Sequence, residues 1–96
     1  MSATHPTFEQ FRHDMLAVGY EEVLERPWAP GAEAPVHTHP FEANALVVRG
    51  EMWLTEQGGT ERRLTAGDRF HLGANVPHEE RYGPQGATYW VARRAG

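Results

Sequence analysis

From Tyr20 onward, glycine, proline and aspartate break the chain into short runs of strand-forming residues. This punctuation narrows the possible folds more than any other feature, because many short, closely spaced strands are typical of a β-sandwich or β-barrel. Ten glycines and seven prolines in 96 residues also disfavour long helices, and a chain of this length holds a single core. The expected strands are residues 20–28, 35–39, 43–49, 51–57, 60–65, 69–72, 76–82 and 87–93. We therefore expect one all-β domain.

The segment before Tyr20 has a different pattern and predicts one short helix. Thr7 and Gln10 have the spacing of a capping box, and Gly19 is a typical helix stop. Apolar residues recur at helical intervals at Phe8, Phe11, Met15 and Val18. We expect this stripe to pack against the rest of the fold, which divides the chain into a helical segment over 1–19 and a β domain over 20–96.

Glycines also mark the expected turns. Gly58-Gly59 lies between two strand runs and predicts a two-residue hairpin, because the turns that suit such hairpins need positive φ. Further turns are expected at Arg49-Gly50 and at Ala66-Gly67-Asp68.

The amino-acid composition disfavours several catalytic mechanisms. There is no cysteine and no lysine, and Ser2 is the only serine, so thiolate, Schiff-base and serine-nucleophile mechanisms are disfavoured. The net charge of −4 and the scattered arginines argue against a nucleic-acid partner. No apolar run is long enough to span a membrane, and no signal-peptide pattern is present, so we expect a cytoplasmic protein without a membrane partner.

Two of the six histidines, His37 and His39, stand two residues apart in an expected strand. Alternate residues of a strand project from the same face, so one face carries both imidazoles. Such a pair needs either water or a shared partner such as a metal ion. Spacing alone leaves both possibilities open.

A third histidine, His78, follows a glycine-rich turn at the start of another expected strand. The two blocks together resemble the two motifs of the cupin superfamily (RmlC-like jelly rolls), over about residues 20–94. The matching positions are Gly31, His37, His39 and Gly50 in the first motif, and Gly67 and His78 in the second. The resemblance implies one jelly-roll barrel, a double-stranded β-helix with a short N-terminal helix, and a metal ion held inside by the three histidines.

The chain departs from the family pattern at several positions. Counted back from Gly50, the glutamate of the first motif is Ala43 here, and Glu42 stands one residue early. Glu42 remains a candidate fourth ligand only if the backbone is irregular enough to turn it inward. Gly73, Asn75 and Tyr82 replace the proline, the glycine and the final asparagine of the second motif.

Glu80 is a second candidate carboxylate. An inward-facing His78 brings Glu80 and Tyr82 to the same face of the strand. Glu80 then binds the metal, orients a ligating histidine, or acts as a catalytic general base. In the alternative interpretation, Glu79-Glu80-Arg81 is a solvated run of charges at the end of a strand.

The other three histidines are not expected at the site. His71 lies between the apolar alternates Phe70 and Leu72, so it should face outward. His5 and His13 belong to the N-terminal segment and are expected on the surface.

Imidazole ligands suit a divalent transition metal, namely iron, manganese, cobalt, nickel, copper or zinc, and suit calcium and magnesium poorly. Expected substrate-pocket walls are Phe41, Trp53, Tyr82 and Trp90. A small barrel admits a small ligand more readily than a polymer.

Three functions are compatible with this sequence. The favoured one is a metalloenzyme that acts on a small carbonyl or carboxylate compound by dioxygenase, isomerase or lyase chemistry. The second is a non-catalytic sensory module that binds a small ligand. The third, a metal-independent epimerase or isomerase, leaves the three ligand-position histidines unexplained. A homodimer is expected, because pairing covers exposed strand edges.

Overall fold

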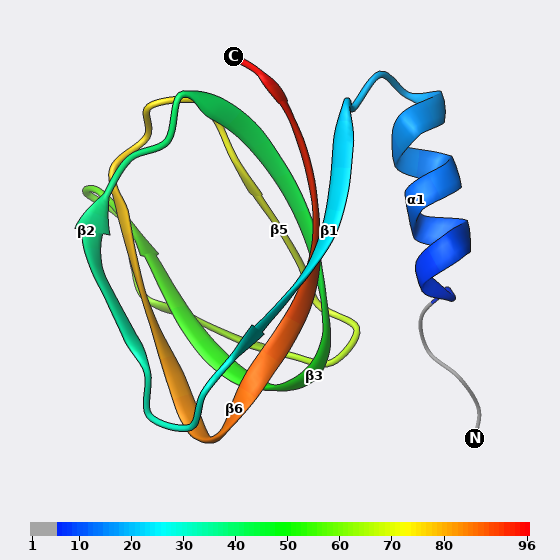
Figure 1. Cartoon of the computed structure of the whole chain (residues 1–96). Coiled ribbons are helices and arrows are strands. Elements are labelled where there is room, and N and C mark those ends of the chain that lie inside the picture. Colours follow the sequence, from blue (N-terminus) through cyan, green and yellow to red (C-terminus); the bar gives the residue numbers. More distant parts are fainter. Residues whose placement is uncertain (1–5) are drawn as a thin grey trace.

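The chain forms a six-stranded antiparallel sheet that curls into a barrel, with one helix outside it (Figure 1). This computed structural model describes residues 6–96. The elements are α1 (Phe8–Ala17), β1 (Glu22–Trp28), β2 (Glu33–His37), β3 (Phe41–Glu56), β4 (Arg62–Thr65), β5 (Arg69–Leu72) and β6 (His78–Ala95). The expected β fold with one short N-terminal helix is confirmed. Within residues 6–96, no helix has the length and apolar character to cross a membrane.

Two long strands, β3 and β6, form the centre of the sheet. They pair with each other, β6 also pairs with β1 and β2, and β3 pairs with β4 and β5. The sequence predicted two separate strands in each of these regions, with a turn at Arg49-Gly50, and that prediction is wrong. The backbone instead continues through bulges, where the pairing register shifts between Val47 and Arg49 and again between Gly50 and Met52.

The bulges have a direct effect on which side chains face inward. In β3 the buried core residues are Ala43, Ala45 and Val47 before the bulges, and Met52 and Leu54 after them. The inward positions therefore change from odd to even numbers between Val47 and Met52, because the irregular pairing there interrupts the alternation of the strand.

Glycine is required where β3 and β6 cross most closely. Gly50 has φ +84°, and a Cβ atom there would lie 2.2 Å from the carbonyl oxygen of Gly86. Only a residue without a side chain accepts both the positive φ and this contact. The glycine pair thus lets one strand bend continuously around the barrel.

The helix begins as its capping pattern predicts. The Thr7 side chain accepts a hydrogen bond from the Gln10 backbone, and the Gln10 side chain accepts one from the Thr7 backbone, both at 3.1 Å. Phe11 is 1% exposed and packs with Trp90 on the outside of the sheet. Val18 is 62% exposed, so its assignment to the packed stripe is wrong.

The two remaining turn predictions have different outcomes. Ala66-Gly67-Asp68 forms the expected turn between β4 and β5, where the Asp68 side chain accepts a hydrogen bond from the Thr65 backbone N–H at 2.8 Å. The prediction of a two-residue hairpin at Gly58-Gly59 is wrong, because the last residue pair before the loop joins Leu54 to Arg62. These two glycines lie within a longer loop.

Candidate metal centre

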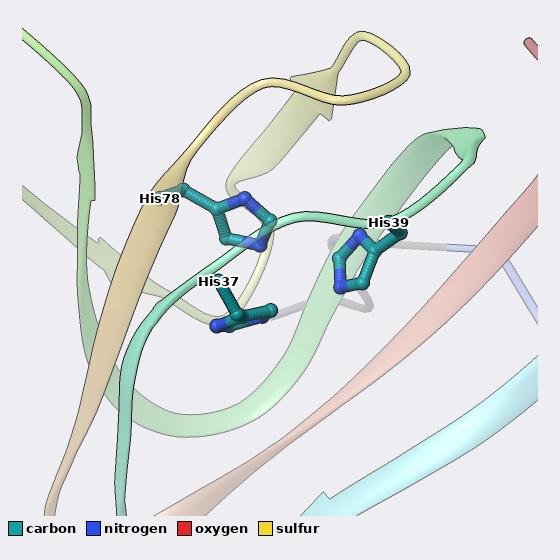
Figure 2. A group of neighbouring side chains, drawn as sticks. All are labelled: His37, His39 and His78. Carbon is teal, nitrogen blue, oxygen red and sulfur yellow. The ribbon is translucent and has the colours of Figure 1, made fainter.

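Three histidines, one from β2, one from the segment after it and one from β6, lie close together (Figure 2). His37 is the last residue of β2 and pairs in register with His78, the first residue of β6. His39 lies two residues beyond the end of β2. One ligand nitrogen of each ring lies within 4.8 Å of the others. The prediction that these three side chains converge is confirmed.

A backbone hydrogen bond holds the segment that carries His39. The Asn75 N–H donates to the His39 carbonyl at 2.7 Å. Asn75 has φ +62°, a conformation that asparagine tolerates better than most residues. This explains how Asn75 replaces the family's glycine in the second motif.

Hydrogen bonds determine which nitrogen of two rings is free. His37 Nδ1 lies 2.7 Å from the Pro35 carbonyl, and His78 Nδ1 lies 2.9 Å from the Val76 carbonyl. A carbonyl oxygen only accepts, so each Nδ1 carries the proton and donates it. In the neutral rings, Nε2 then has a free lone pair, as in histidines that bind a metal.

Glu80 completes the cluster. It is 6% exposed, and its Oε2 lies 3.3 Å from His78 Nε2 and 3.7 Å from His37 Nε2. The hydroxyl of Tyr82 donates a hydrogen bond to Oε1 and so fixes the carboxylate. Glu80 thus faces inward as strand alternation predicts, and the alternative of a solvated charge run does not hold for it.

The donor set fits a transition-metal ion. His78 is 1% exposed, and its Nε2 has no hydrogen-bond partner within residues 6–96, although Glu80 Oε2 lies 3.3 Å away. A buried polar atom without a partner is costly, and a cation between Nε2 lone pairs and a carboxylate removes that cost. The absence of further carboxylates among the clustered groups of residues 6–96 disfavours calcium or magnesium.

Burial and neighbouring charges shift the pKa values at this centre. Burial, followed by the charges of His78 and His37, lowers the pKa of His39. For His78, burial lowers the pKa, but the adjacent Glu80 carboxylate and the hydrogen bond to the Val76 carbonyl outweigh this effect, and the net shift is upward. Burial raises the pKa of Glu80, whereas the adjacent His78 ring and the hydrogen bond from Tyr82 lower it more. The centre therefore favours a charged carboxylate beside the imidazoles.

Glu42 does not join the histidines, and its assignment as a metal ligand is wrong. Its carboxylate accepts hydrogen bonds from Arg94 at 2.7 and 3.3 Å and from Tyr20 at 2.9 Å, and it contacts His71 at 2.7 Å. Pairing is regular at this position, opposite Arg94, so no bulge turns Glu42 inward. Bonds with Arg94, His71 and Tyr20 lower the pKa of Glu42 to about 2.

The remaining histidines lie away from the centre. His71 and His13 are exposed, as predicted, although His71 also contacts Glu42. His5 lies outside the described residues.

Two of the four expected pocket walls lie inside the barrel. Phe41 stacks on His39 with ring centroids 4.6 Å apart, and Tyr82 stacks on Trp28 at 4.8 Å. The assignment of Trp53 is wrong, because it lies between the inward-facing residues of β3 and its ring contacts the exposed Arg81 guanidinium at 4.1 Å.

The assignment of Trp90 is also wrong. The inward-facing residues of β6 at this level are Tyr89 and Val91. Trp90 therefore faces outward, where its ring packs edge-on against Phe8 of α1 with centroids 5.3 Å apart. It belongs to the contact between helix and barrel.

A small cavity of about 40 Å³ borders His39 and Glu80. Three of its polar lining residues were not expected from the sequence: Arg26, Tyr89 and Arg93. The signal for Arg26 was present, because it alternates with Leu24 and Trp28 in β1 and so shares their inward face. The signals for Tyr89 and Arg93 depend on the register of β6, which the sequence did not show.

Fold and site together define a small β-barrel with a cluster of histidines at one end, and the comparison of sequences identifies the class. The family described as "Cupin domain" matches residues 27–88, more than half of the chain. The chain therefore belongs to the cupin family. No curated protein matches it in sequence.

Solved structures agree with this fold. An RmlC-like cupin from Shewanella frigidimarina NCIMB 400 has a TM-score of 0.67 and 28% identity over 77% of this chain and 65% of its own. The DMSP lyase DddQ from Ruegeria pomeroyi DSS-3 has a TM-score of 0.66 and 29% identity over 76% of this chain and 36% of its own. An oxalate oxidase in complex with glycolate, at 23% identity over 76% of this chain and 41% of its own, shares the fold, with a TM-score of 0.66. The chain spans less than two thirds of each of these proteins.

Proposed function

We propose that this chain is a metal-dependent enzyme that acts on a small carbonyl or carboxylate compound. One observation carries the proposal: Nε2 of His37, Nε2 of His78 and a carboxylate oxygen of Glu80 converge, and within residues 6–96 the His78 Nε2 has no hydrogen-bond partner. The lone pairs and the carboxylate repel one another unless a proton or a metal ion lies between them. A divalent transition metal held by His37, His39 and His78 meets this requirement.

When bound, such a metal supplies Lewis-acid activation of an oxygen on the ligand. Residues of the chain provide the proton acceptor and the walls of the site. Glu80 accepts a proton at Oε2, because Oε1 is occupied by the Tyr82 hydroxyl. Phe41 covers one side of His39 and limits the access of water. The small cavity favours a compact ligand.

The comparisons support an enzyme. The likeness to a DMSP lyase, at 29% identity, places a catalytic protein among the structures that resemble this chain. The substrate of that lyase is not assigned to this chain. A lyase, an isomerase and a dioxygenase all fit a metal with a neighbouring base, so the reaction class is left to experiment.

Elemental analysis of the untagged protein tests the proposal. We expect close to one transition-metal ion per chain in the wild type, and loss of stoichiometric metal in the double variant His37→Ala/His39→Ala. The matched control is His13→Ala, which removes an exposed histidine from α1 and should leave the metal content unchanged. Unchanged metal in the double variant, or no binding by the wild type after metal is added, contradicts the proposal and favours the sensory module.

A further inference from the structure

Arg26 has an unusual position for an arginine of a small barrel. It belongs to the inward face of β1, with Leu24 and Trp28, and it is half-buried. Its register partner is Tyr89 of β6, so the two side chains stand opposite each other. Both residues line the small cavity that also borders His39 and Glu80.

The charge of Arg26 is not balanced within the described chain. No carboxylate of residues 6–96 lies within ion-pair distance of it, whereas five of the nine arginines form ion pairs with glutamates. The guanidinium lies over the Trp28 ring, whose centroid is 5.3 Å from Cζ. A guanidinium stays protonated at any ordinary pH, so partial burial costs free energy that an anion recovers.

The neighbouring groups suit an anion on the Arg26 side of the cavity. Burial raises the pKa of Tyr89, so its hydroxyl remains a hydrogen-bond donor at neutral pH. Arg93 also lines the cavity, but Glu22 neutralises it through two hydrogen bonds. Glu80 contributes negative charge at the histidine side. An anionic ligand is therefore attracted to Arg26 and repelled from Glu80.

We propose that Arg26, with Tyr89, binds the carboxylate group of a small organic acid in this cavity. The planar guanidinium pairs with a carboxylate through two parallel hydrogen bonds, a geometry that lysine cannot reproduce. A volume of about 40 Å³ takes a group the size of a carboxylate. The inference deepens the proposed function and rests on it, because it names the substrate class and the residue that orients it.

An NMR titration of the metal-free chain with acetate tests the inference directly. We expect acetate to shift the Arg26 Nε–H resonance in a saturable way, and Arg26→Met to weaken acetate binding about 10-fold or more. The matched control is Arg69→Met. Arg69 also lies near an aromatic ring, with Cζ 5.7 Å from the centroid of Phe11, but on the outside of the sheet. Equal acetate affinity in the two variants overturns the inference.

Two further probes define the ligand class. Acetamide has the shape of acetate without its charge and should not bind. Inorganic phosphate should bind at least about 10-fold more weakly than acetate, because the small cavity and Glu80 oppose a larger, more highly charged anion. Binding of acetamide as tight as that of acetate contradicts the role of charge, and tighter binding of phosphate contradicts the assignment to carboxylates.

Two further measurements separate a misfolded variant, and a chain that binds no metal, from a chain whose Arg26 does not bind a carboxylate. Arg26→Lys keeps the charge and removes the paired hydrogen bonds, so this variant should fold and still bind acetate several-fold more weakly than the wild type; undiminished affinity counts against the inference. Metal content measured on the same wild-type sample tests the proposed function separately. Acetate binding through Arg26 without metal binding overturns only the metal-dependent activity, and metal binding without acetate binding overturns only the carboxylate site.

Discussion

Replacing Glu80 by glutamine tests whether the buried carboxylate belongs to the metal centre. The change removes one negative charge and keeps the size of the side chain. Glu80 Oε2 lies 3.3 Å from His78 Nε2, and the other oxygen accepts a hydrogen bond from Tyr82. The amide oxygen of glutamine still accepts the hydrogen bond from Tyr82, so the variant loses mainly the negative charge. Changing a group that orients metal ligands typically costs about 10- to 100-fold in affinity, or about 1.4–2.7 kcal/mol. We therefore expect Glu80→Gln to weaken metal binding about 10- to 100-fold.

The measurement is a competition titration, in which the protein and a chelator of known affinity compete for Zn²⁺. Glu79→Gln is the matched control, because Glu79 precedes Glu80 on β6, carries the same charge and is exposed. A surface change of this kind should alter zinc affinity by no more than about twofold. Thermal unfolding of both metal-free variants shows whether each is folded. Equal zinc affinities in two folded variants would refute the placement of Glu80 beside the metal.

Two further predictions concern residues outside the metal centre. The pKa of Glu42 is lowered from 4.5 to about 2, so its contribution to stability is present above about pH 4.5 and is lost as the pH falls toward 2. Urea unfolding should therefore show Glu42→Gln less stable than the wild type at pH 7, with a gap that narrows through this window and an unchanged metal content. A gap independent of pH would contradict this. Gly50→Ala should destabilise the barrel by at least about 1 kcal/mol more than Gly31→Ala. Both positions have positive φ, but a Cβ atom at Gly50 would lie 2.2 Å from the Gly86 carbonyl oxygen, whereas a Cβ atom at Gly31 has no neighbour within 4 Å among residues 6–96. Similar urea midpoints would show that the two strands separate easily.

Patterns within one short segment were predictable from the sequence. The capping box of Thr7 and Gln10 depends on residues three positions apart, and it formed as expected. Strand alternation correctly brought Glu80 to the same face as His78. Strand alternation also predicted that Glu42 faces away from the barrel interior unless the backbone is irregular. The pairing at Glu42 is regular. These inferences hold because neighbouring residues of one element are related by local geometry alone.

The direction in which a side chain faces was not predictable by strand alternation where a long strand contains irregular pairing. Trp53 and Trp90 were expected as pocket walls, yet both face outward. Bulges in β3 reverse the alternation between Val47 and Met52, and the sequence showed a turn where the strand continues. The position of a bulge depends on pairing with a distant strand, so no local pattern reveals it.

The sequence by itself determined the chemical groups of the site. The spacing of His37 and His39, with His78 in a second block, specified the imidazole ligands, because those residues and their order along the chain carry the family pattern. The tertiary structure decided which other groups share the cavity. It brought Arg26 opposite Tyr89 and left Glu42 with Arg94, because the register between β1, β3 and β6 sets these neighbours. Register is a property of strands distant in sequence, and it is established only when the whole barrel packs.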